Sequence, residues 1–338
     1  MLKGRFQKYI LYPMISIMIA VLIGAIIILI GGNNPSETFI LMFEGSLGTP
    51  HAIAETVVKT ASLSIAGLSY AFAYRCGMLN IGIEGQMLAG AILSTWVGIN
   101  VTGIPSIFHI LLSLLAGILA GAIIGAFIAF LKNRFSANEV ITTVMINYIM
   151  LFVVEYLVNG PMREAPEFPQ SAKIAPTAEL PNLINGTRVN IGILIAIALT
   201  LIYGIFWKKS QLGFEMRIVG TNPNVAKSIG INVKRCRMIA FAISGGLGGL
   251  VGSLEILGIQ KRLLQSFSAG YGFDGIAVAL LGKNSPLGIL LSSLLFGIMK
   301  TGGNVVQMFS GVPSSVVMII QAVIILMMTI EIFQTKQG

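Results

Sequence analysis

The sequence predicts an all-α protein, a polytopic bundle of transmembrane helices. Of its 338 residues, 55% are hydrophobic and only 10% are charged, and the mean hydropathy is +0.87. A soluble chain of this length needs more charged residues to cover its surface. Apolar runs of about twenty residues recur along the chain, which is the length that an α-helix needs to cross a bilayer. The sequence lacks the alternating segments of about ten residues that are typical of a membrane β-barrel.

The apolar runs give the order of the expected helices. They cover residues 10–31, 52–74, 78–99, 107–131, 139–158, 190–207, 238–257, 273–282, 287–305 and 314–333. The first run follows a basic stretch, but it is too long for a signal peptide and has no A-x-A cleavage site, so we expect a retained helix. About ten spans place both termini on the same side of the membrane.

The distribution of Lys and Arg chooses that side. Basic residues gather before the first apolar run and in the loops that share its side, above all in residues 208–237. The positive-inside rule therefore places both termini in the cytoplasm. Lys261 and Arg262 depart from this rule because they fall on the outer side. The net charge of +9 is spread over loops between apolar spans, which favours membrane topology over nucleic-acid binding.

Two long polar loops separate the apolar runs. Residues 159–189 are rich in proline and carry mixed charge, which predicts an irregular extracytoplasmic loop. Residues 208–237 form a basic cytoplasmic loop. Neither loop holds a soluble catalytic domain, so we expect residues 1–338 to form a single transmembrane domain.

Two apolar runs carry glycines that can share one helix face. They are Gly117, Gly121 and Gly125 in the fourth run and Gly245, Gly248, Gly249 and Gly252 in the seventh. Small residues let helix backbones approach closely in lipid, where the hydrophobic effect does not drive helices together. These glycines therefore predict helix packing.

A cluster of polar residues interrupts the apolar pattern at YRCGMLNIGIEGQM, residues 74–87. A charge at the bilayer centre costs about 3 kcal/mol, whereas one Leu returns only about 0.5, so such a residue faces a cavity or a protein partner. The glycines between them predict a broken helix. We expect Asn80, Glu84 and Gln86 to line or gate a polar passage. The alternatives are hydrogen bonding between helices and an Arg75–Glu84 pair at a helix end.

A second polar group lies in SANEVITTVMINY. Glu139, Thr143 and Asn147 are four residues apart and so share one face of a helix. Ser136 or Asn138 can cap this helix, with Glu139 in its first turn. Capping does not explain Asn147, which lies deep in the run. It either lines the passage or bonds to a neighbouring helix.

Motifs for catalysis are missing from the sequence. Residues 267–275, FSAGYGFDG, fit G-x-G-x-x-G, but that pattern indicates dinucleotide binding only between a strand and a helix. We expect a tight outer loop there, with Asp274 capping the next helix. Cys76 and Cys236 stand apart and predict neither a disulfide framework nor a zinc site. The chain is therefore not expected to be an enzyme or to hold a cofactor.

The cytoplasmic loop contains a short helix with its own boundary signals. Asn222 suits the N-cap, Pro223 suits the first helical position and Gly230 suits the residue after the C-cap. A helix of about two turns is unstable alone in water. It needs either the cytoplasmic face of its own bundle or a second protein to pack against.

Three separated motifs resemble one family. RIVGTNPNVAKSIGINV (217–233) and the following AFAISG (240–245) look like the signature loop of ABC importer permeases. This group serves ribose and other simple sugars, nucleosides and branched-chain amino acids. Residues 75–86 are similar to the family's second signature. ANEVI and Asn147-Tyr148 resemble its nucleoside branch, whose receptors are lipoproteins of the basic membrane protein type.

The resemblance implies partners and places for them. The helix in the cytoplasmic loop would be the coupling helix that docks on an ABC ATPase, through Asn222, Pro223, Asn224, Ala226, Lys227 and Gly230. ATP and Mg would be bound by that partner subunit. Two permeases, identical or paralogous, would form the complex in the bacterial cytoplasmic membrane. A substrate-binding lipoprotein would meet residues 159–189 and 258–272, where Lys261 and Arg262 either face an acidic receptor surface or are simply tolerated.

The polar residues of the expected passage indicate the solute. Asn80, Glu84, Gln86 and Asn147 offer mainly amides, which suits an uncharged solute, most of all a nucleoside. A simple sugar is the second candidate, and a zwitterionic amino acid the third, because it favours fixed charges or half-helix ends. An ion-coupled secondary transporter is the alternative from another class, with Glu84 as ion site, but it needs no isolated cytoplasmic helix.

Overall fold

Helices dominate the protein. The computed structural model describes residues 12–164, 168–268, 270–310, 312–313 and 315–323, and side chains from residue 18 onward. The α-helices are α2 (Tyr12–Ile30), α3 (Pro35–Leu47), α4 (Pro50–Arg75), α5 (Ile83–Asn100), α6 (Ser106–Phe135), α7 (Glu139–Asn159), α8 (Gly192–Lys209), α9 (Gln211–Thr221), α10 (Pro223–Ser228), α11 (Val233–Glu255), α12 (Tyr271–Leu281) and α13 (Pro286–Ser310). The all-α prediction is confirmed. A π-helical turn, Ile256–Gln260, extends α11, and Pro176–Ala178 form a 3-10 turn.

Several of these helices are suited to a bilayer. Within the described ranges, α6, α7, α8, α11 with its π-helical turn, and α13 make five helices long and apolar enough to cross a membrane. The number rises to 6 if the bent pair α2–α3 counts as one span. Helices α4 and α5 cover two further expected runs, but their charged and polar side chains, such as Glu55 and Lys59 in α4 and Glu84 and Gln86 in α5, lower their hydropathy. Residues 315–323 of the tenth run are helical, and the remainder of that run lies outside the described residues.

Helix α3 is a helix that the apolar pattern does not predict. Asn34 caps it, with Oδ1 accepting from Ser36 N at 3.1 Å, and Pro35 takes its first position. It bends away from α2 by 117°, so α2 and α3 are two separate helices. Its sequence is too polar to register as an apolar run, although the Asn-Pro start signal is present.

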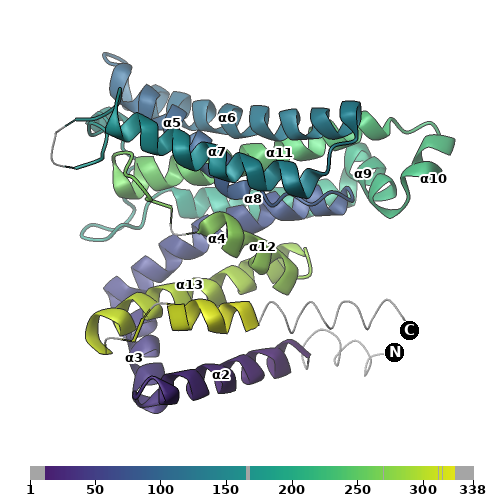
Figure 1. Ribbon diagram of the computed structural model, residues 1–338. Helices are drawn as coiled ribbons and strands as arrows, with labels where there is room; N and C mark the ends of the chain where they lie inside the picture. The colour runs from purple at the N-terminus through teal and green to yellow at the C-terminus, as the bar shows by residue number, and fades with distance from the viewer. Residues whose placement is uncertain (1–11, 165–167, 269, 311, 314, 324–338) are drawn as a thin grey trace.

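The helices form a bundle with α4 at its centre. In Figure 1, α5, α6, α7 and α11 lie together on one side of α4, and α2, α3 and α13 lie on the other. Residues 61–73 of α4 are buried without interruption. A separate small core, with Ala20, Met299, Val317 and Ile320, joins α2 to α13 and the helical segment after it. The largest core cluster includes Cys76 and Ile83, which lie on either side of the break between α4 and α5.

The glycines pack helices as predicted, but those of α11 face two neighbours: Gly245 and Gly249 meet α6, whereas Gly248 and Gly252 meet α5. A Cβ added at Gly121 would lie 2.1 Å from the carbonyl oxygen of Gly245. A Cβ added at Gly249 would lie 2.1 Å from the carbonyl oxygen of Gly117. Backbone meets backbone at both points, so only glycine fits. This contact fixes the position of α11, which carries one wall of the polar cluster.

The bundle has two different ends. Helices α9 and α10 stand at one end, and the described parts of the segment between α7 and α8 stand at the other (Figure 1). The end of α4 belongs to the α9–α10 end, because a Cβ at Gly77 would lie 3.0 Å from Gly220 Cα. The two motifs at residues 75–86 and 217–233 thus meet in space.

Candidate functional site

The break between α4 and α5 is a non-helical segment that runs inside the bundle. Helix α4 ends at Arg75, Gly77 adopts a positive φ of 74°, and α5 starts only at Ile83. Gly82 stands at the N-cap position and has no side chain to cap the helix. Asn80 replaces that cap in part, because its Oδ1 accepts a hydrogen bond from Gly82 N at 3.0 Å. The predicted helix break is confirmed.

Asn80 and Gln86 are joined to each other and to α11. Asn80 Nδ2 lies 2.9 Å from Gln86 Oε1 and 2.8 Å from Ser244 Oγ, and it is within donating distance of both. Gln86 Nε2 donates back to Asn80 Oδ1 at 3.3 Å. Ser244 Oγ in turn donates to the carbonyl of Ser69 in α4 at 2.6 Å. Asn80 and Gln86 are fully buried, so this network joins α4, α5 and α11 at their common core.

Asn147 links α7 to the same break. Its Nδ2 donates to Ile81 O at 2.9 Å, and its Oδ1 accepts from Gly85 N at 2.8 Å. Gly85 lets the two chains approach, since a Cβ there would lie 3.0 Å from Asn147 Cα. Thr143 and Asn147 are both buried on the face that the four-residue spacing predicts. Asn147 therefore supplies two of the backbone partners that the broken helix lacks.

Glu84 is a buried carboxylate at the start of another helix. Its Oε2 accepts from Gly272 N at 2.8 Å, in the first turn of α12, and Ser268 Oγ donates to its Oε1. The N-terminus of a helix favours negative charge, which gives the carboxylate a partner inside the bundle. The alternative Arg75–Glu84 pair is wrong, because Glu84 bonds at α12 and Arg75 donates to Asn284 O at 2.7 Å.

The first turn of α12 also corrects the prediction for Asp274. Gly270, with a positive φ of 78°, precedes the helix and makes no side-chain cap. Asp274 instead forms an ion pair with Lys300 of α13. The pair joins two helices through their interior faces, which a capping role would not do.

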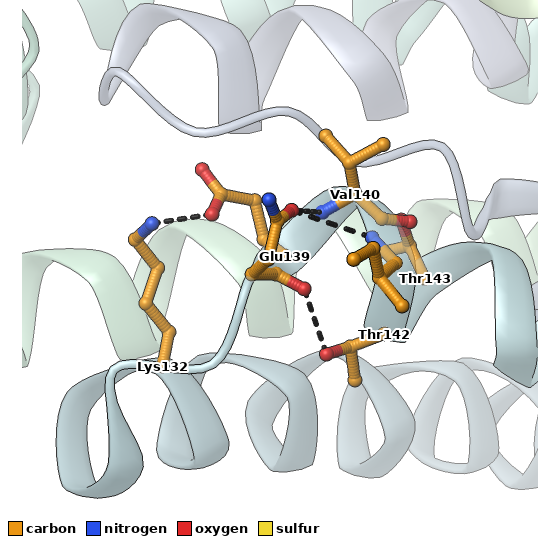
Figure 2. A network of polar contacts seen from close by, with 7 residues as sticks. Lys132, Glu139, Val140, Thr142 and Thr143 are labelled. Atoms are coloured by element: carbon orange, nitrogen blue, oxygen red, sulfur yellow. Dashed lines mark hydrogen bonds and ion pairs between the residues drawn. The ribbon is translucent and has the colours of Figure 1, made fainter.

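The start of α7 is capped locally. Asn138 is the N-cap, and its Oδ1 accepts from Val140 N at 2.9 Å. Figure 2 shows Lys132 reaching the carboxylate of Glu139 and Thr142 turned back toward the preceding loop. Ser136, the other predicted cap, is instead the C-cap of α6, with a positive φ of 55°. Glu139 is thus explained by capping and pairing.

A basic hollow opens where the two motifs meet. It has a volume of about 600 Å³ and is lined by Arg75, Arg217 and Lys283 together with neighbouring residues. The guanidinium of Arg75 lies over the rings of Tyr203 and Trp207, at 5.3 and 5.1 Å from their centroids. These rings and Asn284 O hold the cation at the end of α4.

Helix α10 has the boundaries that the sequence predicts. Asn222 Oδ1 accepts from Asn224 N at 2.9 Å, and Pro223 takes the first position. Gly230 has a φ of +85°, and Ile231 N donates to Ala226 O at 2.9 Å, which is the Schellman pattern.

The side chains of α10 differ sharply in exposure. Ala226 is fully buried against α9 and α11, so it holds the helix on its own bundle. Val225 and, at the C-cap, Ile229 are 51% and 59% exposed. Packing on the bundle therefore accounts for the burial of Ala226, but it leaves two aliphatic side chains exposed.

Described residues of the segments 159–189 and 258–272 are hydrogen-bonded to each other. Ser171 N donates to Leu263 O at 2.9 Å, and Ile174 N donates to Lys261 O at 3.0 Å. Lys261 pairs with Glu179, and Arg262 pairs with Glu164 at 3.2 Å. The two cations that depart from the positive-inside rule are thus neutralised within the chain.

The sequence analysis missed some partners of the buried charges. Ser268 bonds to Glu84 from a loop far along the chain. Glu255, inside the seventh run, is buried and accepts from Ser62 Oγ at 2.6 Å. The position of Glu255 within an apolar run could have marked it as a buried acid. Nothing near Ser268 in the sequence indicates that it bonds to Glu84. Within the ranges that the structure describes, His, Cys, Asp and Glu form no group suited to a metal ion.

Comparisons with known proteins agree on one class of protein. The family described as "Branched-chain amino acid transport system / permease component" matches residues 52–329. The guanosine ABC transporter permease protein NupP of Bacillus subtilis is 35% identical over 325 residues, which cover 94% of this chain and 92% of that protein. The nucleoside ABC transporter permease protein NupB of Lactococcus lactis is 36% identical over 334 residues, 96% of this chain and 92% of that one. The glucose ABC transporter permease protein TsgB13 of Haloferax volcanii is 33% identical over 334 residues, 95% of this chain and 88% of that one.

Proposed function

The chain belongs to the family of permease components of branched-chain amino acid transport systems, and on this premise we propose that it is the permease subunit of an ATP-driven nucleoside importer. It is a multi-pass protein of the cell membrane. The observation that carries the proposal is the 35% and 36% identity, over almost the whole chain, to permeases named for guanosine and nucleosides.

The proposed complex has the partners that the sequence implies. A cytoplasmic ABC ATPase binds ATP and Mg, a second permease completes the passage, and an extracytoplasmic lipoprotein delivers the solute. In this arrangement the chain spans the membrane about ten times with both termini in the cytoplasm, in line with its charge distribution. Residues 159–189 lie outside and residues 208–237 inside. Two guanosine ABC transporter permease proteins of Bacillus subtilis, NupP and NupQ, are both similar to this chain, which supports a paralogous second permease.

Helix α10 is the proposed contact with the ATPase. Its N-cap and Schellman end keep it formed, Ala226 seats it on the bundle, and Val225 and Ile229 remain exposed for a partner. Asn222, Pro223, Asn224, Lys227 and Gly230 complete this coupling element. ATP binding by the partner would move α10 and rock the two permeases between outward-open and inward-open states. The ligands shift this equilibrium only by binding the two states with different affinity.

The assignment of Asn80, Glu84, Gln86 and Asn147 to the passage remains a proposal. Their polar atoms are bonded to the protein in this conformation. They would therefore meet solute only in a state where those bonds exchange. The break they support connects α4 with α5, α7, α11 and α12, so it is placed to change when the helices rock.

Uptake by cells lacking this gene tests the proposal. Cells complemented with the chain should take up labelled guanosine, adenosine or uridine, and this uptake should stop on ATP depletion but survive collapse of the proton gradient. The opposite energy dependence would indicate a secondary transporter. The 33% identity to a glucose permease makes simple sugars the second candidate. Uptake of labelled glucose or ribose in place of nucleosides would select it.

A further inference from the structure

Helix α7 leaves an unusually large part of its surface uncovered. Only 17% of its most apolar window is buried within the chain, compared with 78% for α11. The helix runs beside α5 at the side of the bundle (Figure 1). Its opposite face is fixed, because Asn147 holds Ile81 O and Gly85 N. These two hydrogen bonds fix the rotation of α7 about its axis and so determine which residues face outward.

Aromatic side chains follow one line along this outward face. Tyr148, Phe152 and Tyr156 are 56%, 61% and 69% exposed, and they lie four residues apart. Residues at this spacing stack one above the other along a helix. The three rings therefore form a continuous aromatic stripe, which we call the α7 stripe.

The outward faces of the neighbouring spans differ from the α7 stripe in having no tyrosine among their described residues. The exposed side chains of α8 include Leu201 and Ile202, and those of α6 include leucines together with Phe127 and Phe130, as expected for contact with lipid. Within positions 18–323, apart from the gaps, Tyr148 and Tyr156 are the tyrosines whose side chains are exposed. Both lie on α7.

The depth of Tyr148 is the deciding observation. It lies nine residues from the first residue of α7 and eleven from the last, Glu139 and Asn159, which places it near the middle of the span. Tyrosine is enriched where a bilayer meets water, and a hydroxyl without a partner is costly in hydrocarbon. Tyr156 is close to a helix end, where tyrosine is ordinary. A face that presents Tyr148 at mid-span is suited to a polar space and poorly suited to lipid.

The outer end of α7 continues this polar character. Gln265 Nε2 donates to Glu155 Oε1 at 3.0 Å, so a carboxylate lies one residue before Tyr156. Glu155 is three residues after Phe152 and seven after Tyr148, so its carboxylate lies on the same side of α7 as the stripe.

We propose that the α7 stripe lines the solute passage, and that Tyr148, Phe152 and Tyr156 are positions on which the planar ring of the solute stacks. The inference rests on the proposed nucleoside substrate for the identity of that ring. Every nucleobase has a π-face, so aromatic side chains can stack on a nucleoside whichever base it carries. The phenol hydroxyls add hydrogen-bonding groups for the polar edges. An uncharged, flat solute is the class that this surface fits.

Accessibility of an introduced thiol tests the lining. The two native cysteines, Cys76 and Cys236, are buried and are first replaced by alanine. In this background, Tyr148→Cys is compared with Ile202→Cys on α8. Ile202 is a matched control, because it is 57% exposed and also near mid-helix. A positively charged methanethiosulfonate reagent, applied to the assembled complex in membranes, should modify Tyr148→Cys at least tenfold faster. Saturating guanosine and receptor should slow that reaction several-fold.

Equal, slow modification at both positions would overturn the inference. This result would follow if lipid covers the face and also if the second permease packs tightly against it. Fast modification that a sugar slows and nucleosides do not would refute the proposed substrate while leaving the passage lining supported. Uptake gives a separate readout for stacking. Tyr148→Phe should retain several-fold more guanosine uptake than Tyr148→Leu, because the ring is kept. Equal uptake by these two variants, with normal complex assembly, would remove the stacking role.

Discussion

Asn80 shows how much one amide can hold together in this bundle. It contacts Gln86, Ser244 and the backbone N–H of Gly82, and none of its surface reaches solvent. Polar groups buried in a membrane protein have no water to replace a lost partner. Each bond of Asn80 therefore matters to the position of the break between α4 and α5.

We expect Asn80→Leu to destabilise the protein by about 1–3 kcal/mol, because it leaves buried donors and acceptors without partners. The measurement is thermal unfolding of the purified permease in detergent. Asn159→Leu is the control, since Asn159 is exposed and makes one bond, to Glu155 O at 2.8 Å. Equal unfolding temperatures for the two variants would show that the Asn80 network contributes little.

Glu179 gives a prediction for acidic pH. Burial raises the pKa of Glu179, but hydrogen bonds from Lys261 and Lys173 outweigh it, and the net pKa lies below the usual 4.5. Because the pKa is lowered, the folded state favours the ionised form of Glu179. Glu179 therefore contributes stability to the folded loop above pH 4.5, and this stability is lost as the pH falls through the lowered pKa. Hydrogen exchange at Ile174 N, which donates to Lys261 O, should report this loss.

Glu179→Gln serves as the reference at each pH, because intrinsic exchange also changes with pH. At neutral pH the variant should exchange faster than the wild type at Ile174, and the two should converge as Glu179 becomes protonated. A constant ratio across the range would mean that Glu179 does not order the loop.

Residue types were easier to predict from the sequence than their partners. The cost of a charge in lipid marked Glu84 as a residue that must face protein or a cavity. Its partners, Ser268 and Gly272, lie nearly two hundred residues away, and only the fold brings them together. The nearest cation in sequence, Arg75, is the wrong partner for the same reason.

At the scale of single helices, local signals predicted boundaries well. The ends of α10 depend on Asn222, Pro223 and Gly230, whose effects act within a few residues, and the structure has them as expected. The start of α3 carries the same kind of signal at Asn34 and Pro35, but its helix is too polar for an apolar pattern to find. Periodicity thus finds helices that face lipid, and capping chemistry is needed for the others.

The outward side chains of α10 make the coupling proposal testable. Val225→Asp or Ile229→Asp should reduce co-purification of the ATPase and ATP-dependent uptake at least about tenfold, because a charge would enter an apolar contact. Ile184→Asp is the control, as Ile184 is 55% exposed at the other end of the molecule. Normal ATPase binding by the α10 variants would place the coupling surface elsewhere. Ala226 is unsuitable for this test because its replacement would disturb the bundle itself.

The α6–α11 contact allows a matched pair of identical substitutions. Gly249→Ala should destabilise the protein by about 1–3 kcal/mol, since its Cβ would lie 2.1 Å from a backbone oxygen that cannot move alone. Gly246→Ala, three residues away, meets the Ile118 side chain at 3.3 Å and should be close to neutral. Unfolding temperatures of the two purified variants decide the matter. Equal values would mean that the two helices can separate without loss.

For the whole molecule, the two ends of the bundle carry the proposed functions. The end with α9 and α10 holds the basic hollow and the exposed aliphatic pair, and the opposite end holds the ion-paired segments 159–189 and 258–272. The charge distribution in the sequence assigns the first end to the cytoplasm. The length of the spanning helices separates these two surfaces. The proposed transport cycle requires this separation, because the ATPase acts from inside and the receptor delivers solute from outside.

Orientation in the membrane is therefore the premise on which the partners depend, and labelling single thiols from outside intact cells tests it. In a background with Cys76→Ala and Cys236→Ala, Asn185→Cys should react with an impermeant maleimide added to intact cells, because residue 185 is exposed in the loop that we propose to lie outside. Ser228→Cys, also exposed and at the end of α10, should react only after the cells are permeabilised. The positive-inside rule acts through the cost of moving basic loops across the membrane, so the basic loop 208–237 should stay inside. Labelling of both thiols in intact cells would place the ATPase contact and the receptor contact on one side. Labelling of Ser228→Cys alone would invert the chain and turn the proposed receptor surface toward the cytoplasm.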